Sequence, residues 1–456
     1  MASTTAPLMV MDVTTAFLHA DLPRDVHVKI RGEVFRLHKA LYGLKDSPRL
    51  FHQHIHSILT RLSWQATITD PCLYTRQHQQ HGQTYLMVYV DDLLYVGGGQ
   101  KEVVEELRPH LQIKHKQGQQ HDYLGIRITR TTTSAATTTS TTTTISLTPY
   151  LSAIAGIGPF RVSTPITIDH GRQIQGGGKE GAMVSGGGRA DNKEQTRQQQ
   201  LPLTQQKQHK HRLKEYQQVL GTLTYAASTA RPDLAYAASV LASKIGHVST
   251  HDVQMARRAL QYAKSHNNIL TTTVEHTTGA AACGYYTTAQ LSDLEKGQQF
   301  PTAQIVTYVD ASFAMDAGRR SRSGIVICVN NMPVYWRSSK QTITALSAAE
   351  AEYSAITEGI KHTIHVRDQL DEMMIKHSTP VILTDSMSAI HMANSDKIQE
   401  RTKHLGIRMQ FTRDHVRKQT VELQHVPSGD QVADMLTKPL HKGAFHRLVQ
   451  KIMHHE

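Results

Sequence analysis

Short apolar runs that contain or end in acidic residues recur along the chain and predict β-strands. Near the start, Leu8–Val13 carries Asp12, and a second apolar run, Leu86–Val96, is interrupted by the adjacent acids Asp91 and Asp92. Two apolar segments separated by two polar residues are typical of a β-hairpin. We therefore expect a hairpin with both acids at or beside its turn.

The same pattern returns near the C-terminus. Ile305–Asp310 is an apolar run that ends in an acid, followed by Ser323–Val329 and Pro333–Trp336 with Asn330-Asn331 between them. Consecutive apolar runs joined by an Asn-Asn turn predict three antiparallel strands.

A helix is expected next, because Ser347 and Glu350 have the spacing of a capping box, in which Glu350 bonds back to the Ser347 amide. Glu352 lies in line with Ile356 and Ile360, which repeat at helical spacing and define a buried stripe. A carboxylate there is costly unless it is paired or bound to a metal, so Glu352 is a candidate functional residue.

Two more acids complete this region. Pro380–Asp385 is a strand ending in an acid, and Val421–Val426 leads into a second capping box at Ser428–Gln431, with Asp434 in the helix that follows. Singly, each acid is better explained as a cap or a surface charge. Together, four acids at element ends of a β-β-β-α-β-α-β-α order form a site for two divalent ions that hydrolyse a phosphodiester: Asp310, Glu352, Asp385 and Asp434.

Between these two regions the composition changes. Thr131–Thr144 holds only Thr, Ser and Ala, and Gly171–His211 is rich in Gly, Gln, Lys and His, so both are expected to be flexible loops or linkers. A helical pattern occupies Glu215–Asn268, before a Thr/Ala/Gly-rich connection to about Gln304. A further helix is expected over Leu50–Leu62. The predicted domains are 1–130, 131–303 and 304–456.

Charge and cysteine content narrow the function class. Among 456 residues, 50 Lys plus Arg against 38 Asp plus Glu give a net charge of +12, which suits a polyanionic partner without proving one. Cys72, Cys283 and Cys328 form no close pair, so reduced thiols in a cell interior are expected rather than disulfides or a thiolate zinc site. Neither a membrane span nor a signal peptide is predicted, and residence in a cytoplasmic particle or the nucleus is expected.

The adjacent pair Asp91 and Asp92 repels unless a divalent cation takes its oxygens. For an isolated pair, an Asp-rich turn facing water is the better explanation. Asp12, at the end of another apolar strand, makes a two-metal phosphoryl-transfer site plausible.

The N-terminal motifs resemble, in order, the reverse transcriptase of copia-type LTR retrotransposons. They are Asp12–Leu22, Lys39–Arg49, Asp70–Tyr74 and Tyr89–Asp92, and the resemblance continues through Tyr123–Ile126, Ser163–Pro165, Gly221–Tyr225 and Thr229–Asp233. It implies that Asp12, Asp91 and Asp92 bind two Mg²⁺ ions, with Mn²⁺ as a substitute, that align a primer 3′-hydroxyl with an incoming deoxynucleoside triphosphate.

The resemblance also implies roles for neighbouring residues. Phe17 takes the steric-gate position that excludes a ribose 2′-hydroxyl, which is compatible with its being a core Phe. Tyr42 and Gly43 lie against nucleotide and template. Lys39, Lys45 and Arg49 are candidates for phosphate contact, although three basic groups so close together are more often a solvated face.

The C-terminal motifs resemble the ribonuclease H domain of the same elements. They are Val309–Ser312, Arg320–Gly324, Ala345–Tyr353, Thr384–Ile390, Arg401–His404 and Asp430–Leu440. By this resemblance Asp310, Glu352, Asp385 and Asp434 hold two Mg²⁺ ions that activate water to cut the RNA strand of an RNA–DNA hybrid. Arg401, Lys403 and His404 face the substrate backbone, with a salt-bridge cluster at a helix N-terminus equally credible.

The implied fold is an α+β or α/β multidomain chain: a reverse-transcriptase palm, a connection region and a ribonuclease H-like mixed sheet with helices. Only eleven residues precede Asp12, so the fingers are expected to be mostly missing, and Asp46 stands where the family usually has Gln. Polymerisation is therefore expected to be impaired while hybrid cleavage persists. Expected partners are an RNA template, a DNA primer, their hybrid and deoxynucleoside triphosphates, with no membrane; the oligomeric state is left open.

Two alternatives remain. A non-catalytic retrotransposon relic would bind nucleic acid through its basic surface without cutting it. A metal-binding or interaction protein would explain the 29 His, but their scatter without clustered ligand spacing argues against it.

Overall fold

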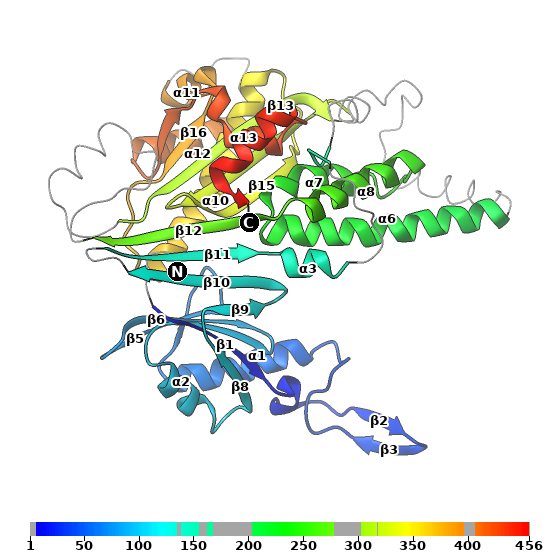
Figure 1. Cartoon of the computed structure of the whole chain (residues 1–456), viewed down its shortest axis with the longest axis vertical. Helices are drawn as coiled ribbons and strands as arrows, with labels where there is room; N and C mark the ends of the chain where they lie inside the picture. Colours follow the sequence, from blue (N-terminus) through cyan, green and yellow to red (C-terminus); the bar gives the residue numbers. More distant parts are fainter. Residues whose placement is uncertain are drawn as a thin grey trace.

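Three β-sheets follow one another along the long axis of the molecule (Figure 1). The computed structural model describes residues 6–134, 138–154, 162–166, 203–277, 302–316, 318–395 and 406–455. The mixed α/β class with several sheets agrees with the sequence-based expectation. Among the described helices, none combines the length and the apolar character needed to cross a bilayer.

The N-terminal sheet has six strands, all in antiparallel pairs. In spatial order they are β4 (Gln65–Ala66), β5 (Leu73–His78), β6 (Gly82–Tyr89), β7 (Asp92–Val96), β1 (Leu8–Val13) and β8 (Ile113–Gln117). The expected hairpin is confirmed: β6 and β7 pair with Tyr89 opposite Asp92, which leaves Val90 and Asp91 as its two-residue turn.

Successive side chains of β1 point to opposite faces of this sheet, and each face packs against a different core. Met9 and Met11 point to a core that includes residues of α1 (Ser47–Arg61), which confirms the expected helix, and of α2 (Gln100–Leu107). Leu8 points to the opposite face, where a smaller cluster continues to the next sheet. Asp12 shares the side of Leu8, because positions two apart along a strand face the same way.

A separate two-stranded sheet projects from this region at the lower right of Figure 1. It consists of β2 (His27–Ile30) and β3 (Glu33–Arg36). The short η1 (Ala16–His19) precedes it and carries Phe17.

The middle sheet corrects the expectation of a flexible loop over Thr131–Thr144. Its order is β18 (His454–His455), β12 (Asn268–Thr277), β11 (Thr138–Ser146), β10 (Ile126–Ser134) and β9 (Gln120–Tyr123). Thr131–Ser134 form the end of β10 and Thr138–Thr144 form most of β11, and the two strands pair with Thr131 opposite Thr142; residues 135–137 lie outside the described residues. Threonine is β-branched and favours extended backbone, so a run poor in apolar residues still forms strands when it has partners on both sides.

Two further expectations for the middle of the chain are partly wrong. The start of the expected connection after Asn268 is strand β12, which pairs with β11. Residues 203–211, expected to belong to a linker, begin α6 (Leu203–Thr229), and the remainder of Gly171–His211 lies outside the described residues.

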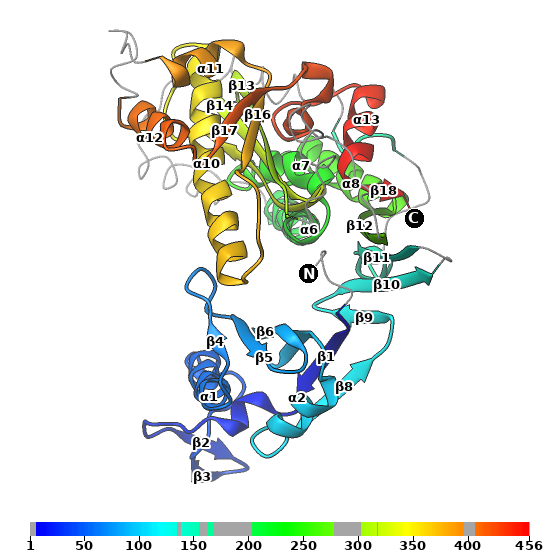
Figure 2. The same cartoon turned by 90° about the vertical axis from the view of Figure 1, so that its left-hand side faces the viewer.

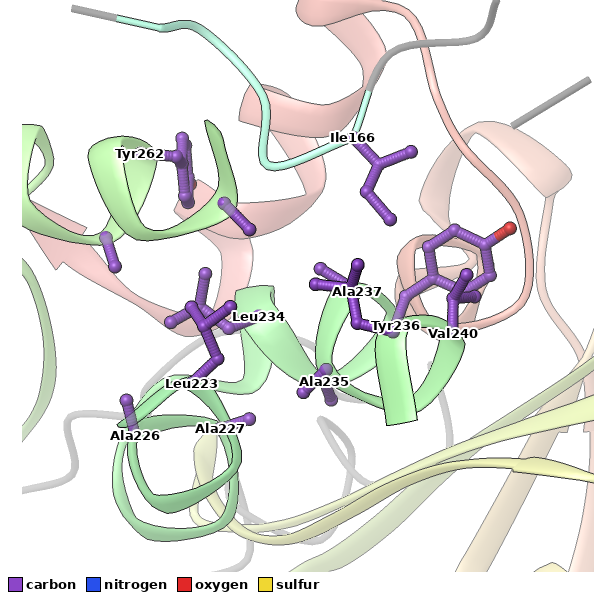
Figure 3. Close-up of a cluster of buried hydrophobic side chains, with 14 of the residues drawn as sticks. Ile166, Leu223, Ala226, Ala227, Leu234, Ala235, Tyr236, Ala237, Val240 and Tyr262 are labelled. Carbon is purple, nitrogen blue, oxygen red and sulfur yellow. The ribbon is translucent and has the colours of Figure 1, made fainter. Parts of the chain in front are cut away.

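The helical pattern over Glu215–Asn268 is confirmed. It comprises α6, η2 (Pro232–Leu234), α7 (Ala235–Ala242) and α8 (Thr250–Ser265), with α3 (Thr148–Ser152) packed alongside. Figure 3 shows part of their shared core, to which Leu223 of α6, Leu234 of η2, Tyr236 of α7 and Tyr262 of α8 contribute together with Ile166. The same core reaches Val326 and Cys328 of the last sheet, so this helical region packs directly against it.

The C-terminal sheet is mixed. Its order is β15 (Met332–Lys340), β14 (Arg320–Val329), β13 (Ile305–Asp316), β16 (Val381–Thr384) and β17 (Glu422–His425). The three expected antiparallel strands are confirmed, with both Asn330 and Asn331 at positive φ in the turn. Pairs β13–β16 and β16–β17 are parallel.

Helices surround this sheet: α10 (Ala348–Glu372), α11 (Met387–Asn394), α12 (Gly406–Arg417) and α13 (Lys442–Ile452). Ser347 caps α10 as expected, whereas the Glu350 carboxylate accepts from the Leu346 amide at 2.7 Å. The prediction of a second capping box is wrong. The segment forms two 3₁₀ turns, η4 (Ser428–Asp430) and η5 (Val432–Leu436). The Gln431 side chain caps η5 by accepting a hydrogen bond from the Ala433 amide.

The far end of α10 reaches the N-terminal sheet (Figure 2). Glu372 accepts hydrogen bonds from the amides of Ile68 and Thr69, each at 3.1 Å, and the Tyr85 hydroxyl donates to the Met373 carbonyl at 2.8 Å. The first and last sheets are thus joined directly by polar contacts.

Candidate active sites

Three carboxylates meet at one end of the C-terminal sheet. Asp310 lies in β13, Asp385 follows β16, and Asp434 lies in η5; one oxygen from each falls within 4.8 Å of the others. Because β13 and β16 are parallel neighbours, acids at corresponding positions along them are brought side by side. The sequence-based expectation that these three acids gather is consistent with this geometry.

Glu352 joins them from α10. The Ala311 amide donates to its Oε2 at 3.0 Å, which holds the carboxylate over β13, and both Asp310 and Asp385 act on it electrostatically. Glu350, the alternative acid in the same motif, instead bonds to the helix N-terminus. The apolar stripe favoured Glu352 over Glu350 as the functional residue. In the structure, Glu352 is the glutamate that lies beside the other acids.

Close packing of η5 on β14 positions Asp434. A Cβ added at Gly324 would lie 2.7 Å from the Ala433 carbonyl oxygen and 2.8 Å from Cγ2 of Thr437. Gln431 is fully buried and donates from Nε2 to the Val309 carbonyl at 2.9 Å. Gly324 of β14 thus leaves room for η5 to pack against the sheet, and the buried amide of Gln431 bonds the start of η5 to β13.

Three residues around the acids were not predicted from the sequence to belong to the site. The Thr437 hydroxyl donates to Oδ2 of Asp310, Ser428 donates to Oδ2 of Asp385 at 2.7 Å, and Nζ of Lys438 lies 2.9 Å from Oδ1 of Asp434. Thr437 and Lys438 follow Asp434 within one turn. That proximity to a candidate acid is the one signal in the sequence that could have indicated them.

Burial and, after it, the crowding of negative charge determine the pKa values at this site. Burial, then the charges of Asp310 and Asp385, raise the pKa of Glu352 to about 9. Burial, then Asp310, raise the pKa of Asp434 to about 7. Burial alone would lower the pKa of Lys438, but Asp310 and Asp434 raise it further than burial lowers it.

A divalent cation fits this donor set. Carboxylate oxygens are the ligands of hard cations such as Mg²⁺ and Mn²⁺, and Lys438 offers the acids a single positive charge. Ionising all four acids in a partly buried site requires more compensation than one ammonium group provides. Asp310, Glu352, Asp385 and Asp434 are the residues that would hold such ions.

The second acidic group lies on the N-terminal sheet. Asp12 of β1 is directly opposite Asp92 of β7, and Asp91 occupies the turn before it, where its carbonyl accepts from the Val13 amide at 2.8 Å. Burial, then the charges of Asp91 and Asp12, raise the pKa of Asp92. Val90 has a φ of 53°, a left-handed conformation that is costly for a β-branched residue and places both acids at the tip of the hairpin.

These three acids are neighbours but gather less tightly than the C-terminal set. Within the described part of the chain, two groups bring three ligand atoms within 4.8 Å of one another, and Asp12, Asp91 and Asp92 are not one of them. They could hold hard cations only with help from ligands outside the protein, such as substrate phosphates.

Three aromatic residues, Phe17, Tyr42 and Phe51, form one cluster of tilted and edge-to-face rings. Phe17 is 9% exposed, its ring centroid lies 4.5 Å from that of Tyr42, and Phe51 of α1 supports it from behind. Tyr42 is 52% exposed, and Gly43 next to it has a φ of 95° with no atom within 4 Å of an added Cβ. The geometry fits both a core Phe and a residue at the edge of a binding surface.

The basic candidates differ in their partners. Nζ of Lys39 lies 2.8 Å from Oδ1 of Asp21, and the exposed Arg49 donates to Gln53 at 3.4 Å, while Lys45 is exposed. Asp46 forms a two-point contact with Arg24 at 2.9 and 3.0 Å, and this hydrogen bonding lowers the pKa of Asp46 to about 2. Its negative charge is therefore neutralised locally. Arg401, Lys403 and His404 lie outside the described residues.

Clustered carboxylates that can hold two divalent cations are found in many enzymes that cleave or transfer phosphate esters. Residues 2–154 match the family described as reverse transcriptase (RNA-dependent DNA polymerase). Nearly the whole chain is also similar to retrotransposon polyproteins. It is 26% identical over 95% of its length to the Pol polyprotein from transposon TNT 1-94 of Nicotiana tabacum, and 27% identical over 98% to that from transposon RE2 of Arabidopsis thaliana.

The resemblance to copia-type Pol polyproteins is thereby confirmed, and it includes the yeast Ty1-BR Gag-Pol polyprotein at 22% identity over 97% of this chain. The chain spans 30%, 27% and 23% of the lengths of these three relatives.

The chain also has similarity to solved structures, with low TM-scores. A foamy viral protease-reverse transcriptase in complex with RNA/DNA hybrid is 12% identical, covering 95% of this chain and 67% of that one, with a TM-score of 0.30. An N-terminal RNase H domain from Mycobacterium tuberculosis is 14% identical, covering 33% of this chain and 98% of its own, with a TM-score of 0.23.

Proposed function

We propose that this chain cleaves the RNA strand of RNA–DNA hybrids at the acidic cluster of the C-terminal sheet. The observation that carries the proposal is the convergence of Asp310, Asp385 and Asp434 within 4.8 Å, with Glu352 held beside them. Four carboxylates from four separate elements match the ribonuclease H motifs one by one. The net charge of +12 suits a polyanionic substrate.

The protein's own contribution is to hold and orient the acids. Thr437 fixes Asp310, Ser428 fixes Asp385, and the Ala311 amide fixes Glu352. When bound, two Mg²⁺ ions supply an activated water and stabilise the charge on the phosphate. Because Glu352 and Asp434 have raised pKa values, these acids give up protons as the cations take their oxygens.

A hybrid-cleavage assay tests this proposal. The full chain should cut a labelled RNA–DNA hybrid in Mg²⁺ or Mn²⁺, and Asp310→Asn should abolish cleavage while leaving the circular-dichroism spectrum unchanged. Asp371→Asn, an exposed acid on the same helix as Glu352, serves as a control and should cut normally. Hybrid binding without any cleavage by the native chain would instead favour a non-catalytic relic.

Nucleotide addition is the second candidate. It is favoured by Asp12 facing Asp92 across a strand pair, with Asp91 at the adjoining turn, inside the segment that matches the reverse transcriptase family. Because these acids are less tightly gathered, we expect cations to bind mainly together with a deoxynucleoside triphosphate and incorporation to be slow.

Primer extension on an RNA template measures this activity separately. Asp92→Asn should remove whatever incorporation the native chain shows and leave hybrid cleavage intact, and Asp310→Asn should have the opposite effect. Robust extension by Asp92→Asn would refute the assignment of this site.

A further inference from the structure

A third group of ligand-type side chains lies away from both acidic clusters. His78 ends β5, His81 sits in the turn before β6, and Glu102 lies in the first turn of α2; one ligand atom of each falls within 4.8 Å of the others. None of the motifs that resemble the reverse transcriptase includes these residues. The histidines were expected to lack clustered ligand spacing, and this expectation is wrong for His78 and His81. They are three positions apart, and both lie beside Glu102.

The distances within this group suit a metal better than a hydrogen-bonded pair. Nε2 of His78 lies 3.4 Å from Oε2 of Glu102, and Nε2 of His81 lies 3.3 Å from Oε1. Both are long for N–H···O hydrogen bonds. Ligands placed about 2.0 to 2.2 Å from a tetrahedral Zn²⁺ are about 3.3 to 3.6 Å apart. Each His–Glu separation falls in this range, one to each oxygen of the Glu102 carboxylate, so small side-chain rotations would bring one ligand atom from each residue to the ion.

The surroundings hold both rings in place while leaving access for an ion. The imidazoles stack at 4.6 Å between centroids, and the ring of His81 lies against the backbone of Gly98 and Gly99, where an added Cβ would come within 2.9 and 2.5 Å of it. Side chains of His78, His81 and Glu102 are 24%, 27% and 48% exposed, respectively.

His78 and Glu102 help to line a cavity of about 850 Å³. An ion bound by these residues would have a free coordination position facing this cavity, where water can bind. We propose that His78, His81 and Glu102 bind one Zn²⁺ ion, with water as the fourth ligand. Two imidazoles and one carboxylate are a common zinc ligand set, and imidazole favours zinc over Mg²⁺.

Metal binding changes one local contact. Nδ1 of His78 accepts a hydrogen bond from the Gln80 amide at 3.2 Å, which leaves the ring proton on Nε2 beside Glu102. Coordination through Nε2 moves that proton to Nδ1, and the Gln80 amide, on an exposed turn, then bonds to water. The ion would join the β5–β6 turn to the start of α2.

Zinc titration of the full chain tests this inference. Millimolar Mg²⁺ is present throughout so that the carboxylate clusters are occupied by the harder ion, and a chromophoric chelator reports free Zn²⁺. We expect one tight equivalent in the native chain. His78→Gln, His81→Gln and Glu102→Gln should each weaken it by about tenfold or more, because replacing even an outer-shell partner costs that much.

His52→Gln is the matched control, because His52 and His56 form another stacked pair, one helical turn apart on α1, with centroids 6.4 Å apart. The tight equivalent should survive this change. The inference is overturned if the native chain binds no tight zinc, or if the equivalent persists in the His78→Gln/His81→Gln double variant. Melting curves without metal verify that each variant is folded.

Discussion

The Thr69 hydroxyl donates to the Glu372 carboxylate at 2.6 Å, across the contact between the N-terminal sheet and the last turn of α10. Oε2 of Glu372 also accepts a hydrogen bond from the Thr69 amide. One carboxylate therefore accepts hydrogen bonds from a loop that lies more than 300 positions away in the sequence. Glu352 lies on the same helix, so this contact links the helix that carries one acid of the C-terminal cluster to the N-terminal sheet.

Glu372→Gln should loosen that contact. The amide keeps the size of the side chain but loses the charge, so we expect a cost of about 1 kcal/mol to the interface. Limited proteolysis should cut the loop near Ile68, which is 93% exposed, several-fold faster. Asp371→Asn is the control, since Asp371 pairs with His377 beyond the end of the same helix. Equal cleavage rates in both variants would contradict the role of Glu372.

The raised pKa values of Glu352 and Asp434, about 9 and about 7, predict how stability depends on pH without metal. Both acids hold protons more tightly when folded than when unfolded. Their contribution to the free energy of unfolding is therefore fully present below about pH 4 and is lost as the pH rises through 7 and 9.

Chemical unfolding at pH 5 and pH 9 measures this loss. Glu352→Gln should flatten the decline, and Mg²⁺ should stabilise the native chain more at pH 9 than at pH 5, because the ionised acids bind it. Parallel pH profiles for the native chain and Glu352→Gln would rule out this electrostatic account.

Gly324→Ala should disturb the C-terminal acidic cluster without removing an acid. The new methyl group would meet the Ala433 carbonyl at 2.7 Å, so η5 must move away from β14 and carry Asp434 with it. Overpacking of this kind costs about 1 to 3 kcal/mol, and a misplacement of about 1 Å can reduce a rate by about 100-fold. Hybrid cleavage and Mg²⁺ affinity should both fall.

Gly443→Ala is the control for that change, because an added Cβ at Gly443 of α13 meets no atom within 4 Å. It should cleave normally and be slightly more stable, as expected for alanine in a helix. If both glycine variants cleave equally well, the close approach of η5 is not required.

Asp233→Asn should strongly destabilise the helical region. Arg231 and Asp233 form a two-point contact at 2.9 and 2.8 Å with both residues 1% exposed, and the hydroxyl of Tyr262 donates to the same carboxylate. Leaving the buried guanidinium without its counter-charge costs about 3 to 5 kcal/mol.

Thermal unfolding compares this variant with Glu215→Gln. Glu215 and Arg257 are also paired, at 2.5 Å, but the arginine side chain is 55% exposed, so this loss should cost less than about 1 kcal/mol. A melting temperature lowered equally by both changes would contradict the importance of burial.

Local patterns predicted much of the structure because hydrophobic alternation and turn residues act over short distances. The β6–β7 hairpin, the Asn330-Asn331 turn and the acids at strand ends all follow from neighbouring residues. Glu352 was distinguished from Glu350 by its position on the apolar stripe of one helix.

Features that depend on distant partners were missed. The Thr-rich residues 131–134 and 138–144 form strands because β9 and β12 pair with β10 and β11 on either side. Thr437 and Lys438 gain their positions from the approach of η5 to β14, which Gly324 allows. The group of His78, His81 and Glu102 depends on the folding of α2 back onto the β5–β6 turn.

The pairing of β18 with β12 has a consequence for how the chain acquires its structure during synthesis. Asn268 and Ile269 pair with His455 and His454, so the middle sheet gains its last strand only when the final described residues leave the ribosome. Contacts so distant in sequence form slowly, and until then the β12 edge can pair with another nascent chain. The speed of translation between these two paired segments is therefore expected to influence the yield of folded protein.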